Sequence, residues 1–427
     1  MKHTMDELRQ WQALPLSIKI KMTETRIRGW VHEYGEDGVY VSFSGGKDST
    51  VLLDIVRNKM GYKDIPAVFV DVPTQYPELR EFAKTFDNVE IIRPKISFVE
   101  VCEKYGFPLI SKEVSECVQG ARKYLTQLMN AADVGTDRQT DRQLPYKYFF
   151  ERVTGTGKYS KFSVAPTADK CAIACGSRGG TITSIENSEA LASILNERML
   201  KRKGGNNQRL AIMLGMLTND KDHPIKANIP ERDRSMFSQE KYKFFLEAPF
   251  EISNKCCNVM KKEPAHRYAK ETGRKPMTAQ MADESRLRTQ KWLQNGCNAF
   301  NAKNPISNPM SFWTEQDVLQ YIYENHIEIC SVYGDVIPDE EKTDGIVGQM
   351  SLWGEDIPMY KTTGCNRTGC MLCGFGCHLE KSPNRFEMLK ETHPGMYQLL
   401  DKVKNNGVTM REAIDWINEH GNLDIKY

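Results

Sequence analysis

Short apolar runs alternate with amphipathic segments in the N-terminal part of the sequence. The apolar runs at 39–43, 67–70 and 89–92 have the length and the content of Val, Ile and Phe that are typical of buried strands. Between them, residues 49–59 and 78–86 carry apolar positions at helical spacing. Strands that alternate with helices in this way form parallel sheets with crossover helices. The pattern therefore predicts an α/β fold with a doubly wound, mostly parallel sheet.

Helices are predicted at both ends of this alternating pattern. Residues 1–38 favour helices that end at Gly35, with Trp30 and Val31 on the apolar side. Near the other end of the chain, residues 384–420 favour two or three short helices.

The middle of the chain, residues 151–250, breaks the alternation. It is rich in glycine and then becomes basic at 201–209. We interpret it as an insertion or a substrate-facing subdomain, and its basic run either contacts nucleic acid or forms a solvated helix end. Regular structure returns with a strand predicted at 276–281 and a helix whose capped start is Thr314.

A glycine-containing turn follows the first predicted strand directly and opens the next helix. Its residues are Ser44, Gly45, Gly46, Lys47, Asp48 and Ser49. Backbone N–H groups at such a turn converge on an anion at the helix N-terminus, where the helix dipole also favours negative charge. The serines add hydroxyl donors, the lysine adds a cation, and the aspartate is expected to hold a metal or to cap the turn. The turn predicts a nucleotide-phosphate site, whereas the alternative is a connection that uses glycines only to bend.

Composition sets only broad bounds on this 427-residue chain. Its length suggests about two or three domains, and a net charge of +2 argues neither for nor against binding of nucleic acid. No apolar run approaches the ~20 residues of a membrane span, and the N-terminus lacks the apolar core of a signal peptide. We therefore expect a cytoplasmic protein without a membrane partner.

Clustered cysteines provide a second candidate site. Twelve cysteines in a reducing compartment indicate metal binding rather than disulfides. The adjacent pair Cys256 and Cys257 combined with Cys370 and Cys373 would suit a [4Fe–4S] cube, because side chains of adjacent residues diverge toward separate irons. Two other interpretations stay open. One is a zinc site of Cys365, Cys370, Cys373 and Cys377, and the other is a redox dithiol of Cys370 and Cys373. Cys297 is expected to be a buried apolar residue.

Several segments together resemble one known family. The turn itself resembles the loop of PP-loop ATP pyrophosphatases. Matching segments at 69–78, 104–112, 256–264, 284–288 and 309–318 resemble the phosphoadenosine phosphosulfate (PAPS) reductase family. The resemblance implies an adenine nucleotide alpha-hydrolase-like sheet, with the nucleotide across the carboxyl ends of the strands. In iron–sulfur members, a Cys-Cys pair and a later Cys-x-x-Cys bind one [4Fe–4S] cluster, and this pattern maps onto Cys256, Cys257, Cys370 and Cys373.

Two departures from the reductases point to a particular branch. The loop keeps Lys47, which suits a pyrophosphate leaving group, and no cysteine follows Cys377 in place of the reductases' Glu-Cys-Gly tail. The combination looks more like the sulfurtransferase branch typified by the DNA-phosphorothioation enzyme, which joins an ATP-splitting loop to an iron–sulfur cluster.

The resemblance implies ATP-dependent adenylation followed by sulfur transfer. Mg²⁺ and the pyrophosphate of ATP would bind at residues 44–49, with Lys47 and Asp48 as catalytic groups and Asp71 near the adenosine. Arg286 and Arg288, expected at the end of the 276–281 strand, would clamp a second phosphate or sulfate, and the alternative is that they are surface charges of a helix. The expected partners are an adenine nucleotide, a sulfur donor such as a cysteine desulfurase, nucleic acid as one class of acceptor, and a second copy in a homodimer.

Two alternative functions stay open. The first is a sulfonucleotide reductase that binds PAPS or adenylyl sulfate and releases sulfite, with another thiol such as Cys365 or Cys377 as nucleophile. The second is a non-catalytic sensor that binds nucleotide and cluster. We divide the chain into N-terminal helices (1–38), two halves of the PP-loop domain (39–150 and 251–360) around the insertion (151–250), and a helical, cysteine-rich C-terminal region (361–427).

Overall fold

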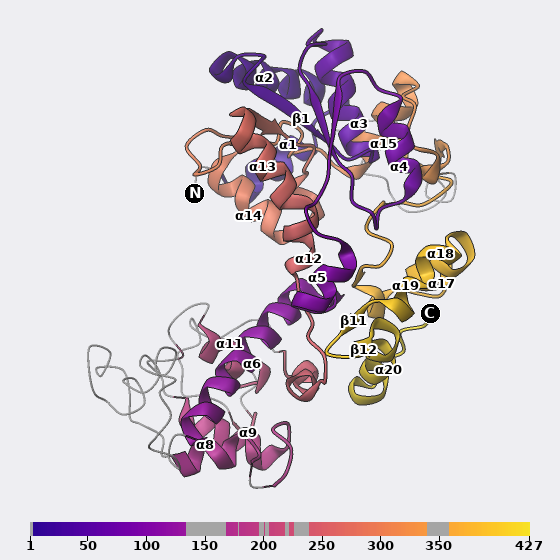
Figure 1. The fold of residues 1–427 in the computed structure, drawn as a ribbon. Helices are drawn as coiled ribbons and strands as arrows, with labels where there is room; N and C mark the ends of the chain where they lie inside the picture. The colour runs from indigo at the N-terminus through magenta and orange to yellow at the C-terminus, as the bar shows by residue number, and fades with distance from the viewer. Residues whose placement is uncertain are drawn as a thin grey trace. The chain divides into compact units, whose positions relative to one another are not determined.

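The chain forms two compact units. The structure is a computed structural model that describes residues 3–133, 168–177, 179–195, 200, 205–217, 222–225, 239–339 and 358–427. The first unit contains Met1–Phe98 and Cys257–Met371, and the second contains Val99–Cys256 and Leu372–Tyr427. Each unit therefore combines residues from both halves of the sequence (Figure 1).

A six-stranded sheet organises the first unit. Its strands, in spatial order, are β3 (Val89–Ile92), β2 (Ala67–Val70), β1 (Val39–Phe43), β5 (Lys275–Met277), β7 (Ile306–Ser307) and β6 (Asn298–Ala299). Neighbouring strands are parallel except β6 and β7. The predicted α/β fold with a mostly parallel sheet is confirmed, and the first three predicted strands have the observed bounds.

Strand β1 is buried on both of its faces because its side chains alternate between two cores. Val39, Val41 and Phe43 belong to the main apolar core, together with residues of helices α2 (Leu16–Tyr34) and α3 (Lys47–Asp54). Tyr40 points to the opposite face, where its ring centroid lies 5.1 Å from that of Tyr268 on α13 (Glu263–Thr272). Helices thus cover both faces, as a doubly wound sheet requires.

The remaining elements of the first unit are mostly helical. They are α1 (Met5–Gln12), the π-helical η1 (Ile55–Lys59) and η5 (Asn258–Lys262), α4 (Pro77–Lys84), η6 (Ala282–Glu284), α14 (Arg286–Asn295), α15 (Glu315–Asn325), η7 (Ser331–Tyr333), and the antiparallel pair β8 (Val336–Pro338) and β9 (Tyr360–Thr362). Helix α12 (Lys255–Cys257) spans the point at which the chain enters this unit. Helix α2 ends at Gly35, as predicted, and Thr314 caps α15 through a reciprocal bond with Asp317.

The predicted strand 276–281 is shorter than expected. It ends at Met277, and the chain then turns into η6, where the Met281 N–H donates to Glu284 Oε2 at 2.9 Å. The carboxylate at the third position of this turn satisfies a backbone donor that a strand would have paired with a neighbour.

The second unit is built largely of helices. They are α5 (Phe98–Tyr105), α6 (Lys112–Asp133), α8 (Ala168–Ala174), α9 (Ile185–Ile194), α11 (Asn206–Met213), η4 (Glu240–Glu247), η8 (Cys377–Leu379), α17 (Arg385–Thr392), α18 (Pro394–Tyr397), α19 (Leu399–Lys402) and α20 (Met410–Gly421). Two short strand pairs accompany them, β4 (Leu109–Ile110) with β10 (Gly374–Phe375) and β11 (Lys404–Asn405) with β12 (Val408–Thr409). The described part of 384–420 thus holds four helices rather than two or three.

The predicted insertion is described only in part. Most of its glycine-rich stretch and residues 201–204 of the basic run lie outside the described residues. From Gly205 the chain enters α11, whose Arg209 forms an ion pair with Glu116 of α6 at 3.3 Å. This described end of the basic run is therefore helical, and its arginine packs within the protein.

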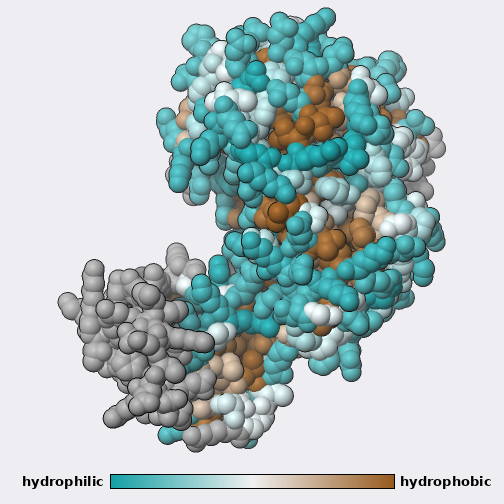
Figure 2. Space-filling model, in the orientation of Figure 1, coloured by the Kyte–Doolittle hydropathy of each residue, from teal (hydrophilic) through white to brown (hydrophobic). Residues whose placement is uncertain are grey.

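The surface drawn in Figure 2 is mostly hydrophilic, with hydrophobic side chains visible in separate small groups. Among the described residues, no helix has both the length and the apolar content that crossing a bilayer requires.

A buried ion pair fixes α15 against α2. Lys19 Nζ lies 2.7 and 2.8 Å from the two carboxylate oxygens of Asp317, and both residues are buried. Burial lowers the pKa of Lys19, and Asp317 opposes that shift. Asp317 also accepts hydrogen bonds from the N–H and the hydroxyl of Thr314. One carboxylate therefore caps α15 and neutralises a lysine of α2.

We predict that Asp317→Asn lowers the free energy of unfolding by about 3–5 kcal/mol, because it leaves the Lys19 ammonium buried without its counter-ion. Denaturant unfolding measures the loss. The double variant Lys19→Met/Asp317→Asn removes the stranded charge and should recover part of the stability. A double variant that is as unstable as the sum of its single changes would contradict the coupling.

Candidate functional site

The glycine turn lies at the point where the strand order of the sheet reverses. The chain runs from β1 to β2 on one side, whereas β5 pairs with β1 on the other side, and all three strands are parallel. Ligands of open α/β sheets bind outside the carboxyl ends of the strands at such a switch point. Residues 44–49 begin immediately after the carboxyl end of β1. The topology thus places the predicted phosphate site where this fold class binds ligands.

The conformation of the turn depends on glycine. Gly45 has φ of +72°, and a Cβ at this position would lie 3.0 Å from the carbonyl oxygen of Leu79. Gly46 precedes α3 and, without a side chain, forms no N-cap hydrogen bond to the first turn of that helix. The N-terminal N–H groups of a helix without such a cap are suited to an anion.

The two serines of the turn bond to the turn itself. Ser49 Oγ donates to the Gly46 carbonyl oxygen at 2.8 Å and lies 3.0 Å from Ser44 Oγ. The backbone N–H of Ser44 donates to Ser49 Oγ at 3.2 Å. In this structure, the hydroxyls that we predicted as phosphate donors close the loop and shape it.

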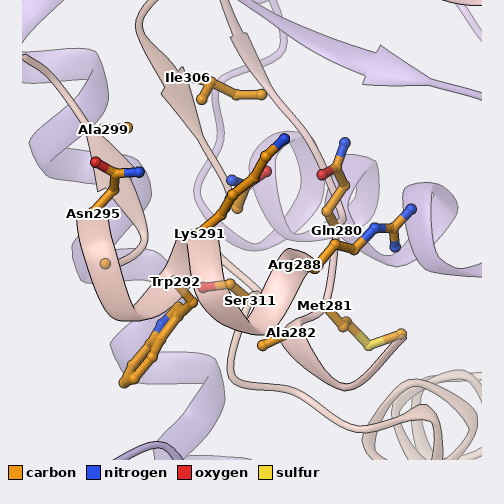
Figure 3. Close-up of a pocket in the computed structure, with 12 residues that line it drawn as sticks. Gln280, Met281, Ala282, Arg288, Lys291, Trp292, Asn295, Ala299, Ile306 and Ser311 are labelled. Carbon is orange, nitrogen blue, oxygen red and sulfur yellow. The ribbon is translucent and has the colours of Figure 1, made fainter. Parts of the chain in front are cut away.

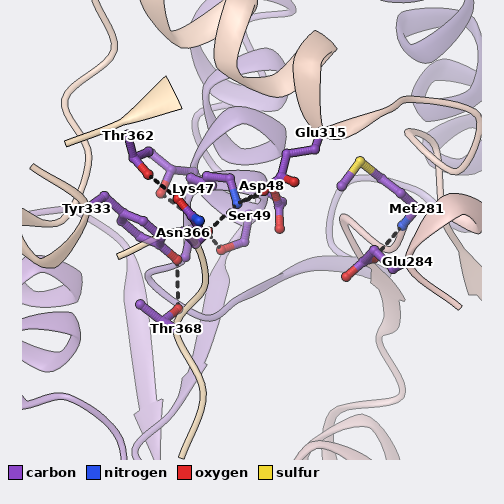
Figure 4. A network of polar contacts seen from close by, with 12 residues as sticks. Lys47, Asp48, Ser49, Met281, Glu284, Glu315, Tyr333, Thr362, Asn366 and Thr368 are labelled. Carbon is purple, nitrogen blue, oxygen red and sulfur yellow. Dashed lines mark hydrogen bonds and ion pairs between the residues drawn. The ribbon is translucent and has the colours of Figure 1, made fainter. Parts of the chain in front are cut away.

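Lys47 is buried and surrounded by oxygen atoms (Figure 4). Its Nζ lies 3.0 Å from Glu315 Oε1 and donates to the Asn366 carbonyl oxygen at 3.0 Å. Asp48 Oδ1 is 3.8 Å away, and the Tyr333 ring centroid is 5.6 Å away. The loop lysine therefore points into the site, but protein groups already take two of its three donors.

Asp48 has the properties of a ligand for a cation. Its Oδ1 is buried and accepts no hydrogen bond from the described residues. Burial raises its pKa, Lys47 opposes the shift, and the Glu315 carboxylate adds to it. A desolvated carboxylate oxygen without a hydrogen bond would be stabilised by a divalent cation, so the residues present fit Mg²⁺.

The two predicted arginines lie on a helix, as in the alternative interpretation, which corrects the preferred expectation of a strand end. Arg286 and Arg288 belong to the first turn of α14, because Ser285 caps this helix after η6. Arg286 is exposed. Arg288 pairs with Glu284, and burial lowers its pKa while Asp48 raises it. Of the two, Arg288 therefore contributes to the electrostatic environment of the turn.

Asp71 forms a buried, fully paired carboxylate. It lies directly after β2, as predicted, and is buried. One oxygen is 2.7 Å from Arg80 and the other accepts from Arg93 at 2.9 Å. Both arginines neutralise the carboxylate. Its main role is therefore to fix the carboxyl end of β2 beside the loop.

A small cavity of about 50 Å³ lies beyond β5 (Figure 3). Arg288, Lys291 and Gln280 are among the residues that line it. Its volume has room for a few water molecules only. We therefore assign no nucleotide to it.

The four predicted cluster ligands form no disulfide, and they divide between the two units. Cys257 and Cys370 belong to the first unit, and Cys256 and Cys373 to the second. Cys256 is buried, whereas the other three are half-buried. Within the described ranges, no three His, Cys, Asp or Glu side chains are grouped as metal ligands. The chemistry of the donor set fits an iron–sulfur cluster, which stays a prediction.

Sequence analysis did not predict several residues of the site. Glu315 lies in the 309–318 segment, which we considered for its helix cap and its family resemblance, not for its carboxylate. Tyr333, Asn366, Arg367 and Thr368 approach the loop from elements far away in the sequence. In the sequence, Glu315 is recognisable only as an acidic residue that follows the Thr314 cap, and nothing there places it near the loop.

Comparison with known proteins identifies the family of the chain. A family model described as the phosphoadenosine phosphosulfate reductase domain matches residues 38–127 and 216–374, which is more than half of the chain. Its members are enzymes that act on adenine nucleotide substrates. No curated protein matches the chain. The match includes the strand, the glycine turn and the segment around Asn366, and the chain therefore belongs to the phosphoadenosine phosphosulfate reductase domain family.

Proposed function

We propose that this protein is an ATP-dependent sulfurtransferase that adenylates an acceptor and then replaces the adenylate with sulfur. The observation that carries the proposal is Lys47. It is a buried lysine and the first residue of α3, at the switch point of the sheet. A cation and backbone donors placed where a pyrophosphate develops charge are what cleavage between the α- and β-phosphates requires.

The first step forms an acyl- or phosphoryl-adenylate. An acceptor oxygen attacks the α-phosphorus of ATP, the bond from that phosphorus to the bridging oxygen breaks, and pyrophosphate leaves with the electron pair. Lys47 and the N–H groups of α3 would hold the pyrophosphate, and Asp48 would hold the Mg²⁺ that accompanies it. Arg288 would add positive charge near the same phosphates.

The second step releases AMP. Sulfur from a donor such as a cysteine desulfurase, reduced to the level of hydrosulfide by a thiol or an electron carrier, attacks the activated atom. The new bond to sulfur forms as AMP leaves with the acceptor oxygen. Cys256, Cys257, Cys370 and Cys373 would hold a [4Fe–4S] cluster, which when bound supplies a carrier for sulfur or electrons. We propose nucleic acid as one acceptor class, and a cytoplasmic homodimer as the working form.

A sulfonucleotide reductase is the second candidate, because the matching family model is described by that activity. A reductase would bind adenylyl sulfate or PAPS and release sulfite after a thiolate attacks sulfur. In this chemistry the bond from sulfur to the nucleotide phosphate breaks, and the leaving group is AMP or adenosine 3′,5′-bisphosphate rather than pyrophosphate, so a loop lysine is less needed. The products distinguish the two reactions.

We predict that anaerobically purified protein converts ATP to AMP and pyrophosphate when acceptor and sulfide are present, and that Lys47→Gln lowers the rate by about 100-fold or more. Coupled detection of pyrophosphate measures it. Lys84→Gln is the matched control, because Lys84 is half-exposed and pairs with Glu81 on α4. Sulfite release from adenylyl sulfate without AMP formation from ATP would favour the reductase, and binding of ATP without turnover would favour a sensor.

We predict that Cys256→Ser and Cys370→Ser each lose most of the iron and sulfide, whereas wild type retains about four iron atoms per chain. Iron and sulfide analysis after anaerobic purification measures the content. Cys297→Ser is the control, since Cys297 is buried and accepts a hydrogen bond from Ser311. If zinc replaces iron and depends on Cys365 and Cys377 as well, the local zinc site is the right interpretation.

We predict that Mg²⁺-dependent binding of nucleotide weakens as pH falls, and that the loss begins above the ordinary pKa of an aspartate. A protonated Asp48 cannot bind the cation, and burial raises the pKa of this carboxyl group. Calorimetric titration from about pH 8 to about pH 5 measures the effect. Asp48→Asn should bind more weakly and lose this part of the pH dependence. An unchanged profile in that variant would show that the nucleotide alone titrates.

A further inference from the structure

Residues 362–368 lie across the phosphate loop, and we call this segment the strap. Two backbone bonds attach it to the chain around η7, from Gly364 N–H to Tyr333 O at 2.8 Å and from Cys365 N–H to Val332 O at 2.9 Å. Farther along, Tyr333 OH lies 2.7 Å from Thr368 Oγ1. Tyr333 and its neighbour Val332 therefore fix the strap at Gly364 and Cys365 and again at its last residue, Thr368.

The strap touches the loop at the glycine that precedes α3. A Cβ added to Gly46 would lie 3.2 Å from Tyr333 Oη and 3.6 Å from Thr368 Oγ1. These hydroxyls thus stand directly against the turn that would hold a phosphate. Asn366 and Arg367, in the middle of the strap, are exposed. Asn366 and Arg367 thus face solvent, and the strap is held mainly by its contacts with the loop, with the chain around η7 and, through Cys365, with the apolar core.

The loop lysine also holds the strap. An ammonium group has three donors, and Lys47 Nζ gives one to the Asn366 carbonyl oxygen of the strap and one to Glu315 Oε1, each at 3.0 Å. Thr362 Oγ1 bonds to the Asn366 side chain at 3.1 Å and to the Cys365 carbonyl oxygen at 3.2 Å. These two bonds fix the conformation of the strap next to the Asn366 carbonyl that Lys47 binds. Two of the three donors of Lys47 are thus engaged within the protein, so a phosphate that takes more than one of them must replace Glu315 or the Asn366 carbonyl.

We propose that Glu315 and the Asn366 carbonyl occupy Lys47 in place of phosphate, and that nucleotide binding displaces the strap from the loop. Glu315 is thereby a positioning residue that holds Lys47 in a resting state. The inference rests on the proposed function, since it takes the loop as the site of a nucleotide polyphosphate. Incoming phosphate and Glu315 compete for the same cation, and each repels the other.

Displacement of the strap has a consequence for thiol chemistry. Cys365 is part of the strap, is half-buried, and packs against the main apolar core. Burial raises the pKa of this thiol, while the Lys47 charge opposes the shift. When the strap leaves the loop, the Cys365 side chain becomes more exposed to solvent. The residues between the strap and Cys370 move with the strap. Occupancy of the nucleotide site would thus control how accessible these thiols are.

The test measures affinity and thiol exposure together in the full-length protein. The probe is the magnesium complex of an ATP analogue with a methylene bridge between the α- and β-phosphates, which binds without turnover. We predict that Glu315→Gln and Tyr333→Phe each bind it about fivefold more tightly than wild type, because each removes one contact that holds the resting state. Glu324→Gln, on the same helix and bonded only to Gln320 among the described contacts, is the matched control.

Alkylation of Cys365 by iodoacetamide, followed by peptide mass spectrometry, measures the strap directly. The rate should rise in wild type when the analogue binds, and it should already be raised in Glu315→Gln without nucleotide. A merely structural role for Glu315 would not tighten binding. Wild-type affinity in both variants with an unchanged alkylation rate would overturn the strap while leaving the proposed function intact. Absence of binding by wild type and both variants would overturn the two together.

Discussion

Burial of β1 on both faces is the constraint on which the rest of the first unit depends. Val39, Val41 and Phe43 need one apolar layer and Tyr40 needs another, so helices must cover both sides of the strand. A strand fixed in this way presents its carboxyl end at a single place, between β2 and β5. The glycine turn therefore begins at the end of a strand that is fixed by packing on both faces. A turn supported in this way can hold charged groups at fixed positions.

The sequence was most informative where a pattern is local. The strand bounds, the Gly35 stop and the Thr314 cap follow from spacing and from residues that are close in sequence. The position of Arg288 was predicted wrongly because a carboxylate three residues after Met281 turned the strand into a helix start. Sequence also identified the loop and the family, but not the partners of Lys47. Glu315 and Asn366 are hundreds of residues away from it, and only the fold brings these groups together.

The site is an electrostatic network in which most charged groups have a partner of opposite charge. Lys47, Asp48 and Glu315 share one partly desolvated region, and Arg288 and Arg367 influence Asp48 from two further elements. Charges that are paired in this way are stable without ligand. In the proposed function, they exchange partners when a polyphosphate and its cation bind, so the loop acts as a set of exchangeable ion pairs.

Helix α15 carries two carboxylates with different tasks on its first turn. Asp317 is fixed to Lys19 in the core, and Glu315, two positions earlier, reaches Lys47. Successive residues of a helix differ by a rotation of about 100° around its axis. Inserting or deleting a single residue before this turn would rotate both side chains away from their lysines at once. The folding of the domain and the charge balance of its ligand site therefore depend on the same helical register. A change of this register would alter the Asp317–Lys19 pair and the Glu315–Lys47 pair together.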